Sequence, residues 1–253
     1  MKDKPKVLGF MTLFYGREYL FASLMSVREH VDKMHIAYTA NPSHGFNTDQ
    51  KCPDSEEEMK HIAMEVMGDK LIWDRAENYP SEAHHRNMRY KHSTGFDVIM
   101  TIDADEVFKE DEIPAAIEYA SNMTERYAGI KGYINFYRSF SHVCKDSFRP
   151  IRFEKLNAGN QLQNLECPLT IYHFSTAQRE EIMRFKYKIF GHASEIKKDW
   201  LEKTYFAWTP EKNEEIEWLH PTSVTIWHHA EPFDKTILPE YLKYHVNFNK
   251  HLI

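Results

Sequence analysis

The chain has 253 residues, 42% of them hydrophobic and 28% charged, and a formal net charge of -6 at pH 7. These values are ordinary for a globular protein with a sizeable core, and they argue against broad non-specific nucleic-acid binding. The apolar runs are too short for a membrane span, the N-terminus lacks the apolar core of a signal peptide, and the three cysteines lack metal-ligand spacing. We therefore expect a cytoplasmic protein without a disulfide framework.

The first hundred residues alternate between short apolar runs and segments with helical periodicity. Strands are predicted at 7–13, 34–39, 71–73 and 98–102, with helices near 20–31, 55–67 and 81–92 between them. Ser55 and Glu58 form a capping box at the start of the second helix. This alternation predicts a mostly parallel sheet with right-handed crossovers.

The pattern changes in the second half of the chain. A helix is predicted from Asp111 through Pro114 to Tyr127, followed by strands at 132–140, 148–153 and 169–174. Further on we expect a helix after Ser175, a strand at 224–227 and a C-terminal helix at 239–251. A soft boundary near residue 140 separates a first half, 1–140, from a second half, 141–253, of one compact domain.

The triplet Asp103-Ala104-Asp105 follows the apolar run 98–102 directly. Two carboxylates one residue apart at a strand end offer the hard oxygen ligands that Mg²⁺ and Mn²⁺ prefer, with phosphate and water in the other positions. Glu106 extends the cluster, and no basic residue follows until Lys109. Repulsion among these acids predicts a compensating cation, either a metal or an arginine or lysine from elsewhere. The alternative is a solvated loop that caps the next helix.

With this order of elements the chain resembles the GT-A glycosyltransferases, especially the family 2-like branch. The matching features are the first strand running into Thr12, Asn78, the pair Arg86-Asn87, and Asp103-Ala104-Asp105. The family usually ends its first strand in Pro-x-Tyr-Asn and its second in Asp-Asp-x-Ser. Here those positions read Thr12-Leu13-Phe14-Tyr15 and Tyr38-Thr39-Ala40-Asn41, so the motif does not identify the nucleobase.

The resemblance implies an α/β fold of GT-A (Rossmann-like) type, a mostly parallel sheet flanked by helices, with a nucleotide-sugar-binding first half and a smaller mixed acceptor-side second half. It implies transfer of a hexose or pentose from a nucleoside diphosphate, UDP being favoured, to a hydroxyl with inversion. Mn²⁺ or Mg²⁺ would neutralise the leaving diphosphate. The acceptor, whether glycan, protein or modified nucleic acid, stays open.

The same resemblance suggests roles for individual residues. His173 would join Asp103 and Asp105 at the metal, with His228 as its rival. The nucleotide sugar would contact Thr12, Asp74, Arg86, Asn87, Asp103, Arg179 and Lys186. Glu195 and Asp199 are the candidate catalytic bases. Structural alternatives remain for these residues: Asp74 as a helix-initiating loop acid, Arg179 and Lys186 on a solvated helix face.

Aromatic residues of the second half allow two interpretations. Tyr205, Trp208 and Trp218, with the C-terminal helix, would shape the acceptor side if their rings stack on sugars. Burial in a core is the favoured interpretation for each of them.

Other functions fit the acidic triplet as well. Asp103-x-Asp105-x-Val107 matches the signature of haloacid-dehalogenase-type (HAD-like), Mg²⁺-dependent phosphatases, in which the first aspartate is the nucleophile. That motif normally closes the first strand of its domain, whereas three predicted strands precede it here. A non-catalytic nucleotide-sugar-binding protein is a further alternative. A nucleotidyltransferase is disfavoured, because no Gly-rich phosphate loop lies near the first strand.

Overall fold

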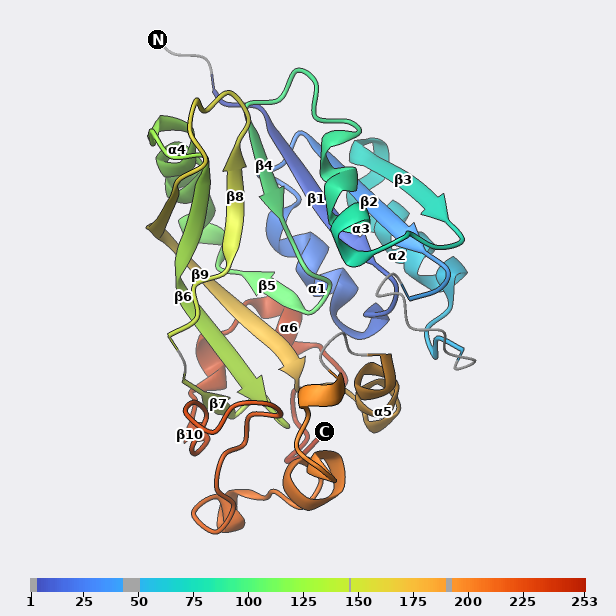
Figure 1. The fold of residues 1–253 in the computed structure, drawn as a ribbon, viewed down its shortest axis with the longest axis vertical. Helices are drawn as coiled ribbons and strands as arrows, with labels where there is room; N and C mark the ends of the chain where they lie inside the picture. Colours follow the sequence, from blue (N-terminus) through green and yellow to red (C-terminus); the bar gives the residue numbers. More distant parts are fainter. Residues whose placement is uncertain (1–3, 43–50, 146, 190–192) are drawn as a thin grey trace. The chain divides into compact units, whose positions relative to one another are not determined.

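The computed structural model describes residues 4–42, 51–145, 147–189 and 193–253 (Figure 1). The chain divides into two compact units. The first unit comprises residues 1–133 and 149–172, and the second unit comprises 134–148 and 173–253. The predicted boundary near residue 140 falls inside the first segment of the second unit, and the expectation of a single domain stays a prediction.

Four parallel strands form the centre of the first unit, in the spatial order β3-β2-β1-β4. They are β1 (Val7–Leu13), β2 (Lys33–Thr39), β3 (Leu71–Ala76) and β4 (Val98–Thr101), and Figure 1 shows them side by side. Beyond β4 the pairing becomes antiparallel, with β8 (Ile151–Lys155) and then the first part of β6 (Tyr127–Tyr137). The predicted α/β class with a mostly parallel sheet is confirmed.

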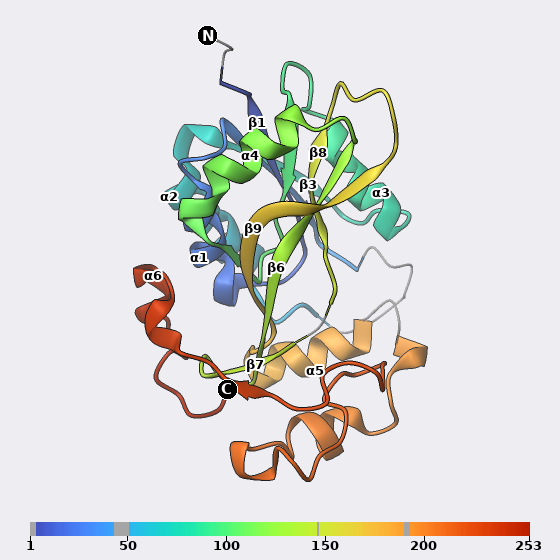
Figure 2. The same cartoon turned by 90° about the vertical axis from the view of Figure 1, so that its left-hand side faces the viewer.

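Helices cover both faces of these strands. They are α1 (Arg17–Val27), α2 (Glu56–Met67), α3 (Glu82–Asn87) and α4 (Ile113–Asn122), with 3-10 turns η1 (Gly68–Lys70), η2 (Met88–Tyr90) and η3 (Glu110–Glu112). Figure 2 shows α1, α2 and α4 on one side of the sheet and α3 on the other. Ser55 caps α2 as predicted, accepting a hydrogen bond from the Glu58 amide. Helix α4 ends at Asn122, short of the predicted Tyr127, because Tyr127 already begins β6.

The two faces of the sheet differ in character. The face under α1, α2 and α4 carries the main core, which includes Val7, Met11 and Met100. The opposite face, here called the α3 face, has only a small apolar cluster of Leu8, Phe10, Ala37 and Ile99, with Met88 and Phe96 packed on it. Because side chains alternate along a strand, polar residues of β1, β2, β3, β4 and β8 also stand on the α3 face: Thr12, His35, Asp74, Thr101, Arg152 and Glu154.

Two of the remaining strands pair with each other. β5 (Glu106–Phe108), which directly follows the acidic triplet, pairs with β9 (Gln163–Thr176), and β9 also pairs with β6. In the second unit, β7 (His142–Cys144) pairs antiparallel with the end of β6 and with β10 (Glu231–Pro232). The helical elements there are α5 (Glu180–Ile189), η4 (Ala193–Glu195), the π-helical turn η5 (Leu201–Tyr205), η6 (Pro210–Lys212), η7 (Lys235–Ile237) and α6 (Glu240–Lys243).

Aromatic side chains build the core of the second unit, among them Tyr137, Trp200, Tyr205, Trp208 and Trp227. Tyr205 and Trp208 are both 0% exposed, so burial in a core, the favoured interpretation, is confirmed for both, and neither ring is accessible for stacking on a sugar. The reason is that their rings pack edge-on around Tyr137. Trp218, at 36% exposure, is the most accessible of the three predicted acceptor residues.

Two predicted elements of the second unit are wrong. Residues 224–227 form no strand, because Trp227 adopts a left-handed backbone conformation (φ 55°) and its carbonyl accepts a hydrogen bond from the Leu219 amide. The predicted helix at 239–251 is reduced to α6, after which the chain continues in turns. Within the described residues, no helix is long and apolar enough to cross a membrane.

Candidate active site

Asp103, Ala104, Asp105 and Glu106, here called the acidic loop, make a tight turn that leads from β4 into the first residue of β5. The Glu106 amide donates to the Asp103 carbonyl at 3.0 Å. Ser23 of α1 donates to the same carbonyl from its hydroxyl, also at 3.0 Å. Asp103 and Asp105 are half-buried, whereas Glu106 is 0% exposed. The turn therefore presents two carboxylates toward solvent and directs the third into the protein.

Arg152 of β8 supplies the compensating cation that the sequence predicts. Its Nη2 lies 2.8 Å from Oδ2 of Asp103, and its Nε donates to Oε2 of Glu106 at 2.7 Å. A second bond joins Nη2 to Oε1 of Glu106, which also accepts from the Tyr133 hydroxyl at 2.8 Å. Burial raises the pKa of Glu106, with Arg152 opposing the rise and Asp103 adding to it.

Sequence reasoning did not identify Arg152 itself. The available signal was its position between Ile151 and Phe153 in an apolar strand. A charged residue there must find a partner, because an unpaired buried charge is very costly. That signal indicates the need for a partner but does not say which carboxylate provides it.

Gly16 fixes how closely the start of α1 approaches the acidic loop. It has φ +127°, and a Cβ added to it would lie 2.6 Å from the Cβ of Ala104. Its amide, like that of Arg17, donates to the buried Asp54 carboxylate, at 2.8 and 3.0 Å. A side chain at this position would displace the loop, so Gly16 is a site residue that sequence reasoning missed.

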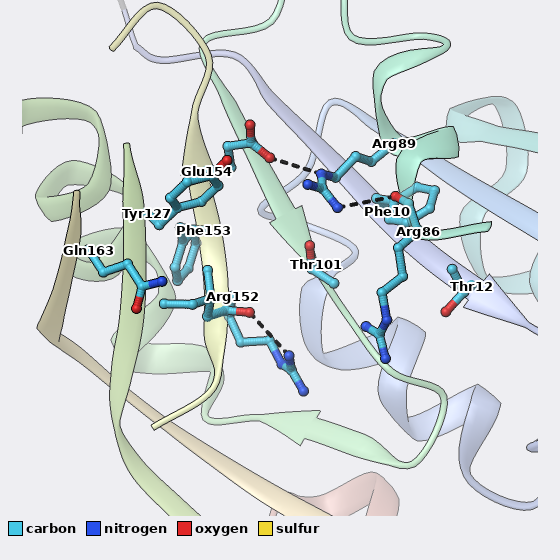
Figure 3. Close-up of a pocket in the computed structure, with 11 residues that line it drawn as sticks. Phe10, Thr12, Arg86, Arg89, Thr101, Tyr127, Arg152, Phe153, Glu154 and Gln163 are labelled. Carbon is cyan, nitrogen blue, oxygen red and sulfur yellow. Dashed lines mark hydrogen bonds and ion pairs between the residues drawn. The ribbon is translucent and has the colours of Figure 1, made fainter. Parts of the chain in front are cut away.

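A cavity of roughly 280 Å³ opens on the α3 face (Figure 3). Arg86 of α3 and Arg152 of β8 approach it from either side of β4. Its lining comprises Phe10, Thr12, Arg86, Arg89, Thr101, Tyr127, Ile151, Arg152, Phe153, Glu154 and Gln163. Arg152 belongs both to this lining and to the acidic-loop network, so the cavity adjoins the carboxylates.

The arginines of the cavity differ in their partners. Arg89 is held by Glu154, which also binds Arg126, at 2.9 and 2.6 Å. Arg86 pairs with Glu82 at 2.7 Å, but both side chains are nearly half exposed. Since an exposed pair of this kind contributes at most about 0.5 kcal/mol, Arg86 can turn to another anion at little cost. Asn87, its predicted companion, is exposed at the end of α3.

Asp74 lies in a second polar cluster on the α3 face. Its Oδ2 accepts from Nε2 of His35 at 2.9 Å and from Nε2 of His92 at 3.0 Å, and Lys91 Nζ lies at 3.0 Å. Burial lowers the pKa of His35 to about 4, so this imidazole is neutral near pH 7. Burial would raise the pKa of Asp74, but hydrogen bonds from Lys91 and His92 lower it. The predicted contact of Asp74 with a nucleotide stays a prediction.

The other predicted site residues belong to the second unit. His173 of β9 has its Nδ1 2.7 Å from Oδ1 of the buried Asn135. Because an amide oxygen only accepts, Nδ1 carries the proton and the lone pair lies on Nε2, as a metal ligand requires. Its rival His228 is exposed on the irregular segment that follows Trp227.

The basic residues around α5 have local partners. Arg179 lies 3.5 Å from Glu181. Lys186 is only 9% exposed and donates to the Ser175 carbonyl at 3.1 Å and to its hydroxyl at 2.5 Å. The alternative of a solvated helix face is therefore wrong for Lys186, which instead holds the end of β9.

The two candidate bases are both exposed. Glu195 ends the short turn η4. Asp199 has a left-handed backbone (φ 57°) and pairs with Lys203 at 2.8 Å. Their catalytic roles stay predictions.

Comparisons with known proteins find distant structural likenesses only. No family model matches the chain, and no curated protein matches it. S. aureus TarS 1-349 has a TM-score of 0.37 and 12% identity, over 50% of this chain and 35% of that one. Glucosyl-3-phosphoglycerate synthase from Mycobacterium tuberculosis, in complex with Mg²⁺ and uridine diphosphate, has a TM-score of 0.37 and 10% identity, over 51% and 44%.

The chain thus spans less than half the length of the structures that it matches. TarS 1-349 in complex with UDP gives a TM-score of 0.36 at 13% identity, again over 50% and 35% of the two chains. With TM-scores of 0.36 and 0.37, these matches are not used to infer function.

Proposed function

We propose that this chain is a glycosyltransferase that binds a nucleoside-diphosphate sugar, UDP being favoured, at the acidic loop and the adjoining cavity. The observation that carries the proposal is the double role of Arg152. Its guanidinium binds Asp103 and Glu106 and also lines the cavity with Arg86 and Thr12. Carboxylates that can hold a cation and arginines that can hold phosphate oxygens are thereby combined at the carboxyl ends of β1 and β4, where open α/β sheets bind ligands.

The donor groups fit a divalent metal. Arg152 binds Oδ2 of Asp103, which leaves Oδ1 for a cation beside the half-buried Asp105. One or two carboxylates, completed by phosphate and water, are a common set for Mg²⁺ or Mn²⁺. When bound there, such an ion would neutralise charge on the departing diphosphate. Glu106 is unsuited as a third ligand, because Arg152 and Tyr133 already use both of its oxygens.

The chain's own residues would hold the donor in three ways. Arg86, weakly tied to Glu82, can pair with a diphosphate oxygen in a bidentate manner. Thr12 at the end of β1 offers a hydroxyl at the cavity wall. Arg152 keeps Asp103 in place, so that the carboxylate is ordered before any ligand arrives.

Transfer to a hydroxyl with inversion needs a base for the acceptor proton. Glu195 and Asp199 remain the proposed candidates, and His173, Arg179 and Lys186 the proposed second-unit contributors. For His173 the support is the tautomer set by Asn135. For Lys186 the support is weaker, because its ammonium already bonds to Ser175.

Nucleotide release from UDP-, GDP- and CDP-sugars tests the proposal. The wild type is compared with Asp105→Asn and with the matched control Asp111→Asn, whose carboxylate is exposed on η3. We expect release of one nucleotide with Mn²⁺ or Mg²⁺, abolished by EDTA, reduced at least about a hundredfold by Asp105→Asn, and unchanged in the control.

Two outcomes would contradict the proposal. The first is silence across the donor panel together with the absence of metal-dependent nucleotide binding in a direct titration. The second is equal activity of wild type and Asp105→Asn. Hydrolysis of a generic phosphomonoester, run in parallel, would instead support the phosphatase alternative.

A further inference from the structure

We propose that His35, Asp74 and His92 form a binding site for a divalent transition-metal ion, with Zn²⁺ the best match. Among the residues that the structure describes, these three form a group whose potential ligand atoms all lie within 4.8 Å of one another. None of the three residues lines the cavity of the proposed nucleotide-sugar site, although Asp74 is also a predicted nucleotide contact, and the inference does not depend on that function.

The geometry is close to what a tetrahedral ion requires. Zn²⁺ at about 2.0–2.1 Å from its ligands separates the ligand atoms by roughly 3.3 Å. In the structure, Nε2 of His35 and Nε2 of His92 lie 2.9 and 3.0 Å from the same Asp74 oxygen. Both distances are within a few tenths of an ångström of that separation, and the two histidine nitrogens lie within 4.8 Å of each other.

The ligand types select the metal. Two imidazoles and one carboxylate suit Zn²⁺ and its first-row neighbours, whereas Mg²⁺ prefers oxygen ligands alone. The side chains of Asp74 and His92 are 19% and 32% exposed, so a water molecule can reach the fourth coordination position of the ion. When Nε2 of His35 binds the ion, its proton moves to Nδ1, which is buried without a hydrogen-bond partner among the described residues, so ion binding must offset the cost of that unpaired N–H.

The three ligands come from separate segments of the first unit. His35 lies on β2 and is 0% exposed, Asp74 lies on the adjacent β3, and His92 follows η2. The rings of His35 and His92 meet edge to face, with centroids 4.7 Å apart. An ion here would tie the segment after α3 to the sheet, and such binding adds directly to folding stability.

Lys91 is the competitor of the ion. Its ammonium lies 3.0 Å from the same Asp74 oxygen, on a side chain that is 50% exposed. A bound cation must displace it toward solvent, which the exposure of the side chain permits. Removing the ammonium should therefore tighten metal binding, an effect opposite in sign to the loss of a ligand.

The test is titration of chelator-treated full-length protein with Co²⁺, followed by visible absorption, and with Zn²⁺ by calorimetry. We expect one equivalent to bind with a tetrahedral Co²⁺ spectrum and to raise the melting temperature. His92→Ala and Asp74→Asn should weaken binding at least about tenfold, and Lys91→Met should tighten it severalfold.

Two variants serve as controls. His84→Ala removes an exposed histidine of α3 outside the cluster, and Asp105→Asn removes the proposed nucleotide-site ligand; both should keep the Co²⁺ spectrum. Absence of a tetrahedral spectrum in the wild type, or equal affinity in His92→Ala, would overturn the inference. So would loss of the spectrum in Asp105→Asn alone. Failure of the glycosyltransferase assay would leave the inference standing, because metal binding is read out directly.

Discussion

The acidic loop and the His35–Asp74–His92 cluster are two polar groups of the first unit. The first can be recognised in the sequence, whereas the second is visible only in the structure. The acidic loop is contiguous in sequence, and two of its three carboxylates, Asp103 and Glu106, are bound by the buried Arg152. The cluster is assembled from three segments, it is partly exposed, and its cation is the solvent-facing Lys91. A buried arginine makes the first group part of the fold, whereas the cation of the second group is a lysine whose side chain is 50% exposed.

Arg152→Met should have the largest effect on stability. It leaves Glu106 buried without its cation, and loss of one partner from a buried pair typically costs about 3–5 kcal/mol. Urea denaturation measures the change. The control Arg149→Met removes an arginine of 38% exposure paired with Glu166, for which we expect less than about 1 kcal/mol. Equal effects of the two variants would show that the acidic loop is not held by Arg152.

Gly16→Ala should have the second-largest effect on stability. This variant tests the position of the acidic loop and leaves its charge unchanged. The added methyl meets Ala104 at 2.6 Å and the backbone has φ +127°. Strain and overpacking together predict a loss of about 2–3 kcal/mol. Gly159→Ala is the matched control, since a Cβ there meets nothing within 4 Å. A neutral Gly16→Ala in urea denaturation would mean that the acidic loop tolerates displacement.

Asp74→Asn in chelator-treated protein should have the smallest effect. The amide keeps one oxygen for a histidine N–H, and the site is partly exposed, so we expect a loss of about 1 kcal/mol. Thermal and urea unfolding without metal give the value. A loss of unfolding free energy as large as that of Arg152→Met would contradict this contrast, because the cluster would then be as important to the fold as the acidic loop.

Much of the architecture followed from local pattern. Alternating apolar runs predicted the four parallel strands, and Ser55 with Glu58 predicted the start of α2. These features depend on neighbours in sequence, for which periodicity and capping rules are strong. Local pattern failed at 224–227 and 239–251, where aromatic packing and turns override it.

The candidate site was predictable only in part. The acidic triplet can be recognised directly in the sequence, and the repulsion among its carboxylates predicted a nearby cation. The identity of that cation was decided by the pairing of β8 beside β4, which brings Arg152 to Asp103 from 49 residues away. The closeness of Gly16 to Ala104 likewise appears only once α1 is folded onto the sheet.

By itself the sequence determined the α/β class, the parallel order of the first strands and the place of the two aspartates, because each depends on residues adjacent in the chain. Tertiary structure alone decided that Arg152 neutralises Glu106, that Gly16 lies against Ala104, and that His35, Asp74 and His92 meet. The physical reason is common to all three. Burial and electrostatic pairing depend on distances between segments, and strand register sets those distances.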